Sequence, residues 1–299
     1  MSLRDLSLIL LLVLVWGYNF VVIKVGLDGV PPIFLVFSRF FLTAIPFVFF
    51  CKRPKAPFAR VVLYALVIFA LQFTLFFIGM NFGVPPGLAS LLMQVHAFFS
   101  LLLAHFIFHE KIKPWQIVGA TISFLGIAYA GLHFDGNISL VGFFLIIAAA
   151  ATWGTGSAIS KTLGKVNMFS LVVWGSMIAW PPLLLLSLLV EGPAEILSSL
   201  QNLTWISFGS ILYLAYLSTL FGYGLWSWLL HKQPLSKVVP FTLLVPVIAM
   251  FSSALFLGEP IQTWKIIAAL LVIGGLCINF LGPRLFHKKP KPDSTYTQT

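Results

Sequence analysis

The chain has 299 residues, of which 60% are hydrophobic and only 9% charged, and its mean hydropathy is +1.02. Soluble domains carry about 25% charged residues, so this composition excludes a soluble globular protein and predicts an all-α integral membrane protein. The formal net charge of +10 needs no nucleic-acid partner, because the basic residues gather at the predicted span ends.

Ten apolar segments follow one another along the chain, each near the length of about 20 residues that a helix needs to cross a bilayer. In chain order they are residues 5–26, 31–51, 59–80, 84–108, 114–132, 139–161, 167–190, 203–230, 236–257 and 261–283. Proline and glycine mark the joints, as at Pro85-Pro86-Gly87 and Gly258-Glu259-Pro260. The short joints predict a ten-helix bundle with no domain outside the membrane.

Short motifs of the first half recur in the second, at offsets of 137 positions near the start of each half and 149 positions near its end. The matching residues are Trp16-Gly17 with Trp153-Gly154, Lys24 with Lys161, Glu110 with Glu259, and Trp115 with Trp264. They predict two five-helix repeats, 5–132 (spans 1–5) and 139–283 (spans 6–10). Because five is an odd number, the second repeat enters the membrane from the opposite side, so the repeats are inverted.

The basic residues predict the orientation. With a cytoplasmic N-terminus, fifteen of the eighteen Lys and Arg residues fall on the cytoplasmic side, which is the positive-inside pattern. They are Arg4, Lys52, Arg53, Lys55, Arg60, Lys111, Lys113, Lys161, Lys165, Lys232, Lys237, Arg284, Lys288, Lys289 and Lys291. The outer side instead carries Asp28, Asp135, Glu191 and Glu195. The polar, basic segment 284–299 is predicted to be a disordered cytoplasmic tail.

Several motifs carry a resemblance to a known family. They are Val15-Trp16-Gly17-Tyr18-Asn19-Phe20, Ser38-Arg39-Phe40, Phe108-His109-Glu110-Lys111 and Leu257-Gly258-Glu259-Pro260. Through them the chain, up to about Arg284, resembles the EamA family of the drug/metabolite transporter superfamily. Asn81-Phe82-Gly83 and Leu244-Val245-Pro246-Val247 make it most similar, within that family, to enterobacterial exporters of O-acetylserine and cysteine.

This resemblance implies a secondary transporter that exports small amino-acid metabolites, cysteine and O-acetylserine, across the bacterial inner membrane by alternating access. Other amino acids or small amphipathic drugs are the alternative cargo. The implied partners are a small-molecule substrate and the bilayer, with protons as a candidate coupling ion, and the chain acts as a monomer or a homodimer. A membrane enzyme is the alternative from another class, but His105, His109 and Glu110 have no nucleophile beside them.

No cofactor or metal is expected, because the two cysteines, Cys51 and Cys277, form no ligand cluster.

Polar and aromatic residues inside the spans are the candidates for the substrate pathway, because polar groups in a bilayer must face protein or a water-filled cavity. The candidates are Trp16, Asn19, Lys24, Gln72, Phe76, Gln94, His96, Trp153, Thr155, Ser157, Tyr223 and Trp226. For each aromatic residue, ordinary packing is the competing interpretation. Lys24 also has the alternative of reaching the membrane interface.

Three further residues are candidates for a gate or a structural anchor: Arg39, Lys161 and Pro246. Arg39 lies about a third of the way across its span, where it either contacts the substrate carboxylate or bonds backbone carbonyls between helices. Pro246 has Ala97 at its repeat position, so a hinge is expected to be stronger in the ninth span than in the fourth.

Glu110 and Glu259 end spans a few residues before the next helix. A carboxylate there can cap the following helix, which is the favoured interpretation, and proton coupling is the alternative.

Small residues in the fifth and tenth spans predict close packing of these two helices. They are Gly119, Ala120, Ser123 and Gly274-Gly275.

Overall fold

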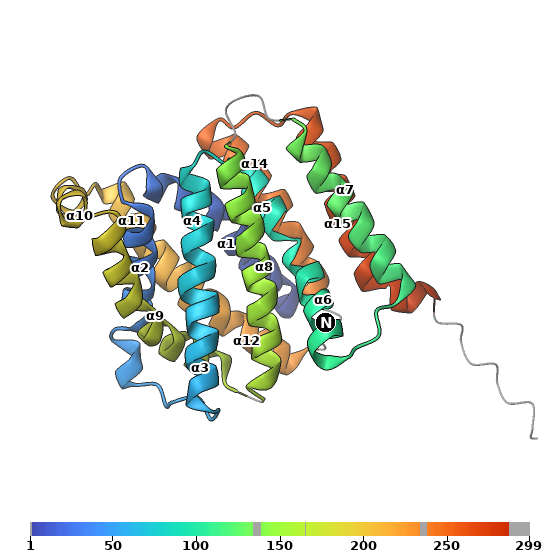
Figure 1. Cartoon of the computed structure of the whole chain (residues 1–299), viewed down its shortest axis with the longest axis horizontal. Helices are drawn as coiled ribbons and strands as arrows, with labels where there is room; N and C mark the ends of the chain where they lie inside the picture. Colours follow the sequence, from blue (N-terminus) through green and yellow to red (C-terminus); the bar gives the residue numbers. More distant parts are fainter. Residues whose placement is uncertain (1, 134–138, 165, 234–237, 287–299) are drawn as a thin grey trace, which may run out of the picture.

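The computed structural model of the chain describes residues 2–133, 139–164, 166–233 and 238–286, which form a bundle of helices (Figure 1). Within those ranges, eight helical segments are long and apolar enough to cross a membrane, and Phe241–Leu257 is a shorter apolar helix. The protein is therefore a multi-pass α-helical membrane protein. Lys165, Lys237, Asp135 and the tail residues 287–299 lie outside the described part of the chain.

The elements of the first half follow the predicted spans closely. They are α1 (Leu3–Leu27), α2 (Pro32–Ala44) with η1 (Phe47–Phe49), the continuous α3 (Phe58–Ala65), η2 (Leu66–Gln72) and α4 (Phe73–Asn81), then α5 (Pro86–Met93), α6 (His96–Phe108) and α7 (Pro114–Gly131). Proline at the first helical position starts α2, α5 and α7, where its missing N–H costs no hydrogen bond.

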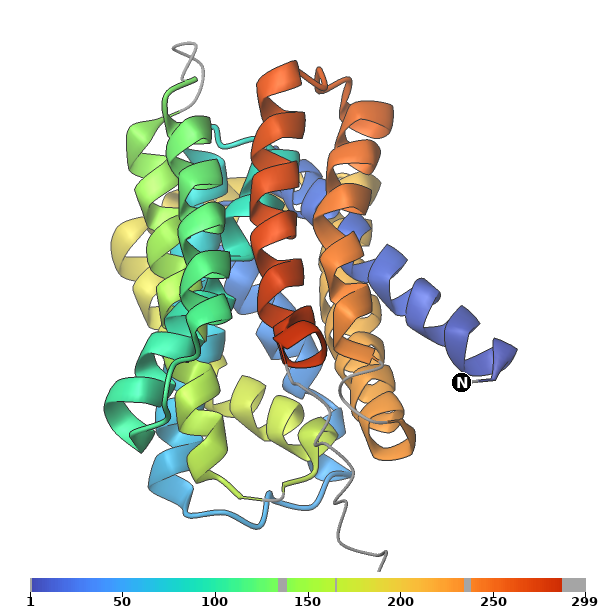
Figure 2. The same cartoon turned by 90° about the vertical axis from the view of Figure 1, so that its right-hand side faces the viewer.

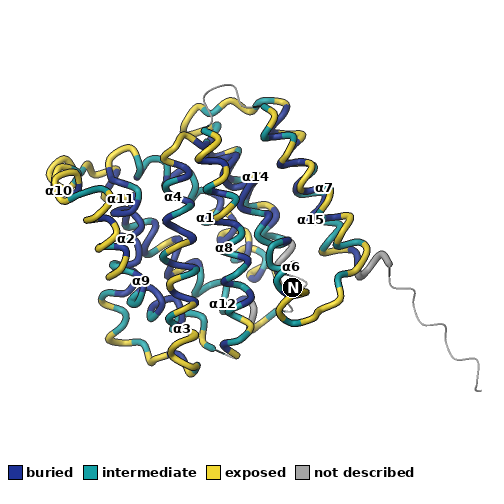
Figure 3. The backbone as a smooth tube through the Cα atoms, in the orientation of Figure 1, coloured by how far each residue is buried: buried dark blue, intermediate teal, exposed yellow. Residues whose placement is uncertain are grey.

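The second half has matching elements and one addition. They are α8 (Leu140–Thr162), α9 (Met168–Val190), α10 (Pro193–Gln201), the continuous α11 (Trp205–Leu212), η3 (Tyr213–Phe221) and α12 (Gly222–Lys232), then η4 (Val239–Leu243), α14 (Leu244–Leu257) and α15 (Thr263–Phe286). Side-chain oxygens of Ser139, Asn167 and Thr204 cap the starts of α8, α9 and α11. The short, mostly exposed α10 was not predicted (Figure 3). Helix α15 extends through residues 284–286, so the predicted disordered tail begins with helix.

Two kinds of helix irregularity recur at repeat-related places. The π-helical segments η2 and η3 lie in the third helix of each half. In the fourth helix of the first half, the α-helix breaks at Gln94 and Val95, between α5 and α6. Adding the repeat offset of 149 to Gln94 gives Leu243, where η4 passes into α14. Interrupted helices of this kind form the binding sites of many transporters built from repeats.

A stronger hinge at Pro246 stays a prediction, because both halves show a helix irregularity at the equivalent place. Pro246 is buried in the first turn of α14, where the backbone N–H has no intrahelical partner to lose, so the proline does not break the helix. The first half breaks at the equivalent place although Ala97 replaces the proline.

The first helix of each half packs in the opposite half. Helix α1 lies against α11, η3, α12 and α14, whereas α8 lies against η2, α4, α5 and α6. We call α1 with α11, η3, α12, η4 and α14 the α1 bundle, and α8 with α3, η2, α4, α5 and α6 the α8 bundle. Figure 2 shows α1 crossing the molecule obliquely. The packing units are therefore not the two halves of the sequence.

Two helix pairs flank these bundles, α2 with α9 and α7 with α15 (Figure 1). As predicted, glycines bring α7 and α15 close: the backbones of Gly119 and Gly275 meet, and Ser123 donates a hydrogen bond to the carbonyl of Val272 at 2.9 Å.

We call the end with the joints 28–31, 82–85 and 258–262 the outer end, at the top of Figure 1, and the end with the joint 109–113 the inner end.

Candidate functional site

A buried arginine marks the candidate site. Arg39 on α2 is only 2% exposed, and its Nε donates to the hydroxyl of Thr219 at 2.9 Å. Its Nη2 lies 3.5 Å from the hydroxyl of Ser218, and its Cζ lies 4.4 Å from the ring centre of Phe73. Among the described residues, Arg39 has no carboxylate partner and its Nη1 has no hydrogen-bond acceptor.

The two π-helical segments build the surroundings of Arg39. Ser218 and Thr219 lie in η3, while Phe73 directly follows η2. The wider π-turn gives Thr219 a second role, because its hydroxyl donates to the carbonyl of Leu214 five residues earlier, at 2.7 Å. The π-turns therefore place hydroxyl groups and a ring beside the guanidinium.

An aromatic wall continues from this point. The indole N–H of Trp16 donates to the carbonyl of Ser218 at 3.2 Å, and its ring lies 5.8 Å from Tyr223 and 5.6 Å from Trp226. Gly222 makes room for it, since a Cβ there would come within 2.5 Å of the indole nitrogen. Three predicted pathway residues, Trp16, Tyr223 and Trp226, thus lie together.

Other predicted pathway residues keep polar atoms buried without a partner. Seven such side-chain atoms occur among the described residues, and four belong to predicted pathway or gate residues: Asn19 Oδ1, Arg39 Nη1, Gln72 Oε1 and His96 Nδ1. Buried polar groups are normally hydrogen-bonded, so these four atoms are candidates for contacts with a substrate or water. His96 also lies 5.2 Å from the ring of Trp153, and Phe76 lies 5.6 Å from Phe20.

The remaining pathway candidates fit less well. The hydroxyls of Thr155 and Ser157 donate to carbonyls of their own helix, at 3.0 Å each. Lys24 forms an ion pair with Asp28 at 2.8 Å at the outer end of α1, and both side chains are largely accessible. Gln94 lies at the break between α5 and α6, where its role stays a prediction.

Glu110 does not cap the helix that follows it. At the start of α7 the side-chain oxygen of Gln116 accepts from the backbone N–H of Lys113 at 2.8 Å, while Glu110 pairs with Lys161 of α8 at 2.7 Å. The three residues between Glu110 and Pro114 carry its carboxylate away from the start of α7, and Lys161 supplies the opposite charge.

Glu259 caps a helix, but a different one from that predicted. Its Oε2 accepts a hydrogen bond from the backbone N–H of Gly87, at the start of α5 in the first half. Glu191, which was not among the candidates, does the same for α2, accepting from the N–H groups of Ile33 at 2.6 Å and Phe34 at 2.9 Å. Neither contact has a signal in the sequence, because each joins residues more than 150 positions apart.

A cavity of about 220 Å³ lies near the inner end, between α6, α8 and α15. Its polar lining consists of Ser100, Ser157, Asn279 and the ion pair of Glu110 with Lys161. Both charged side chains are 52% exposed, so the ion pair is only half covered by the surrounding helices.

Comparisons with known proteins agree with this architecture. The model of the EamA-like transporter family matches residues 4–132 and again residues 140–281. A probable amino-acid metabolite efflux pump of Salmonella typhimurium is 41% identical over 292 residues, covering 95% of this chain and 97% of the relative. The protein of the same description in Escherichia coli K12 is 38% identical over 294 residues, with the same coverage. One crystal structure covers 96% of this chain and 100% of its own at 16% identity with a TM-score of 0.63, which shows a shared fold.

Proposed function

Because this chain belongs to the EamA-like transporter family, it is a transporter and not an enzyme, and we propose that it exports small amino-acid metabolites, with cysteine and O-acetylserine as the favoured cargo. The two relatives described as probable amino-acid metabolite efflux pumps support this cargo class, because their similarity spans almost the whole chain. Other amino acids and small amphipathic drugs are the alternative cargo.

Arg39 is the observation that carries the proposal. Insertion of a charged side chain near the centre of a span costs about 2.5–3.5 kcal/mol, so a retained arginine needs a compensating partner. Two hydroxyls and a ring supply part of it, but no described carboxylate neutralises the charge, and Nη1 is left without an acceptor. A substrate carboxylate would supply both the acceptor and the charge, and guanidinium binds carboxylates in a two-bonded fork.

The cavity beside Glu110 is compatible with an amino acid in size and charge. Sites for drug-sized ligands measure about 300–1,000 Å³, and the cavity beside Glu110 measures about 220 Å³. A small zwitterion fits such a volume, and its two charges match the ion pair that lines the cavity.

Transport follows from two inverted repeats, 5–132 and 139–283, with ten spans and both termini in the cytoplasm. The eight long apolar helices and Phe241–Leu257 account for nine of the ten spans, and α7, which runs beside α15, is the remaining one. Basic residues at the inner end support the orientation, and the α-helical bundle supports the bacterial inner membrane. A monomer contains the whole pathway, and a homodimer is equally compatible with it.

Efflux of labelled cysteine and O-acetylserine from proteoliposomes, with and without a pH gradient, tests the cargo. Saturable efflux of either compound is expected, and dependence on the gradient would establish proton coupling. No efflux of either from folded protein would leave the family membership intact and discard this cargo.

The role of Arg39 is tested with Arg39→Gln in the same assay. Losing a charge-assisted hydrogen bond of about 1.5–3 kcal/mol should raise the KM for cysteine by roughly 10- to 100-fold. Cysteamine, which lacks the carboxylate, should compete with similar weakness against both proteins, and Arg39→Lys should recover only part of the affinity. An unchanged KM for cysteine in Arg39→Gln would make Arg39 an interhelical anchor instead.

A further inference from the structure

The α1 and α8 bundles meet at the outer end. Their mutual contacts join α5 to α14, and α1 to α4 and α5. Helices α5 and α14 approach closely because Gly87 has no side chain: a Cβ there would lie 3.1 Å from Cγ and 3.2 Å from Cα of Met250. Toward the inner end, α6 packs on α8 within its own bundle. The contact of α5 with α14 is therefore a direct joint between the two bundles at the outer end, besides the helices α2 and α9, which contact both bundles.

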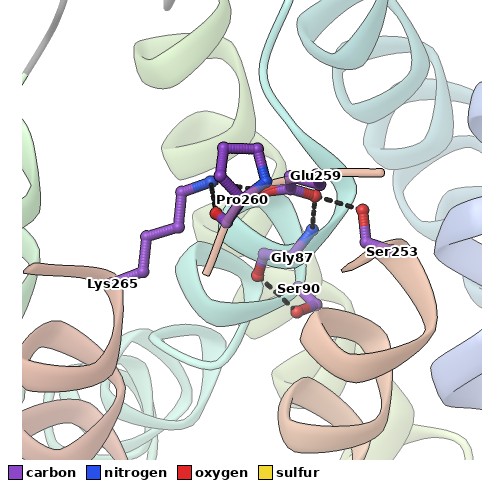
Figure 4. A network of polar contacts seen from close by, with 6 residues as sticks. All are labelled: Gly87, Ser90, Ser253, Glu259, Pro260 and Lys265. Carbon is purple, nitrogen blue, oxygen red and sulfur yellow. Dashed lines mark hydrogen bonds and ion pairs between the residues drawn. The ribbon is translucent and has the colours of Figure 1, made fainter. Parts of the chain in front are cut away.

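One carboxylate is at the centre of that fastening (Figure 4). Glu259, just after α14, accepts hydrogen bonds from the N–H of Gly87 in the α8 bundle and from the hydroxyl of Ser253 in the α1 bundle. Its other oxygen pairs at 2.8 Å with Lys265 of α15, which also donates to the carbonyl of Pro260 at 3.1 Å. We call these residues the outer network.

The outer network is buried in a way that the repeat-related pair at the inner end is not. The side chains of Glu259 and Lys265 are 12% and 6% exposed, and the ion pair is screened little at that depth. Glu110, the repeat equivalent of Glu259, forms a pair of nearly the same length with Lys161, but both side chains are 52% exposed and line the 220 Å³ cavity. The two repeat-related carboxylates therefore differ in exposure: the ion pair of Glu259 is buried, and the ion pair of Glu110 is half exposed.

We propose that Glu259 is the outer latch of the transporter: its hydrogen bond from the N–H of Gly87 on α5, at 3.4 Å, holds the outer end closed, and this contact must break before substrate can leave. The buried ion pair with Lys265 of α15 suits a latch because it fixes the carboxylate beside the positive N-terminal end of α5, where Gly87 donates to it. Glu110 is the residue at the corresponding place of the inner end, and its exposed pair holds no such contact between the bundles. The latch does not depend on which substrate is carried.

Labelling of one cysteine from the outer side tests the latch without any substrate. Ser90 is 1% exposed on α5 and donates to the carbonyl of Gly87 at 2.7 Å, so a thiol there is covered while the latch is closed. The parent protein carries Ser90→Cys with Cys51→Ala and Cys277→Ala, and a membrane-impermeant maleimide is applied in intact vesicles. Glu259→Gln should speed labelling by about tenfold or more, because it removes the negative charge that attracts the N-terminal end of α5.

A second variant and two matched controls make the outcome decisive. The double variant Glu259→Gln/Lys265→Met removes both charges and leaves neither buried alone, so it folds even where the single variant does not, and it too should label rapidly. Glu110→Gln should label no faster than the parent. Glu191→Gln, which loses an outer carboxylate that caps α2 outside this contact, should also keep the slow rate. Slow labelling in the folded double variant, or equally fast labelling in Glu191→Gln, would overturn the latch.

Discussion

Two neighbouring glycines in α15 allow a sharp test of how α7 and α15 pack against each other. A Cβ on Gly275 would overlap the carbonyl oxygen of Gly119 and the hydroxyl of Ser123, and would lie 2.9 Å from the backbone nitrogen of Ser123. A Cβ on Gly274 would meet nothing within 4 Å. The variants Gly275→Ala and Gly274→Ala therefore add the same methyl group to opposite environments.

The expected difference follows from two opposing terms. In a helix, alanine is more favourable than glycine by about 0.5–1 kcal/mol, and Gly274→Ala should gain that amount. Gly275→Ala gains the same but forces backbone atoms apart, which costs about 1–3 kcal/mol, and it strains the bond from Ser123 to Val272, worth about 1 kcal/mol. Gly275→Ala should therefore be destabilised by about 2 kcal/mol net, some 3 kcal/mol below Gly274→Ala.

The free energy of unfolding can be measured by titrating the purified protein from mild detergent into SDS and following tryptophan fluorescence. Wild type, Gly274→Ala and Gly275→Ala are compared under one condition, so the SDS-unfolded reference state is the same for all three and only differences in the free energy of unfolding are interpreted. If Gly275→Ala were as stable as Gly274→Ala, the close backbone contact of α7 and α15 would be refuted.

Two further variants probe the site and its inner end. Gly222→Ala should push the indole of Trp16 out of place and lower the rate of cysteine efflux about tenfold, since a displacement of about 1 Å can lower a rate by more than that. Gly224→Ala, whose Cβ would meet only ordinary contacts, should match wild type. An equal loss of efflux in both variants would argue against the aromatic wall. Glu110→Gln should change the free energy of unfolding in the SDS titration by less than about 1 kcal/mol, because its pair with Lys161 is half exposed; a loss of several kcal/mol would show that this pair is a structural anchor.

Sequence periodicity located the spans well, because a bilayer demands long apolar segments and proline marks where they start. It could not reveal that α1 and α8 pack in opposite halves, since that depends on contacts between residues far apart in the chain. The π-helical segments η2 and η3 were also missed, as nothing in the composition of Leu66–Gln72 separates it from ordinary helix. Short α10 was missed because its residues Pro193–Gln201 are too few and too polar for a span.

The site was predicted in part. Arg39, Trp16 and Tyr223 were candidates because charged and paired aromatic residues are unusual inside spans, and the fold brings them to the same region. Ser218 and Thr219 were not, because a hydroxyl in an apolar helix ordinarily bonds to its own backbone. In three dimensions both hydroxyls face Arg39 of α2, which the sequence does not signal because these residues are about 180 positions away.

The exchange of α1 and α8 between bundles has a consequence for how the protein is made. As the chain emerges from the ribosome, α1 enters the membrane about two hundred residues before α11, η3 and α14, its packing partners, are synthesised. Until then the face of α1 on which Gly17 later meets Ile248 lacks its partner helix α14. The packing around α1 can therefore be completed only after the second half has been synthesised.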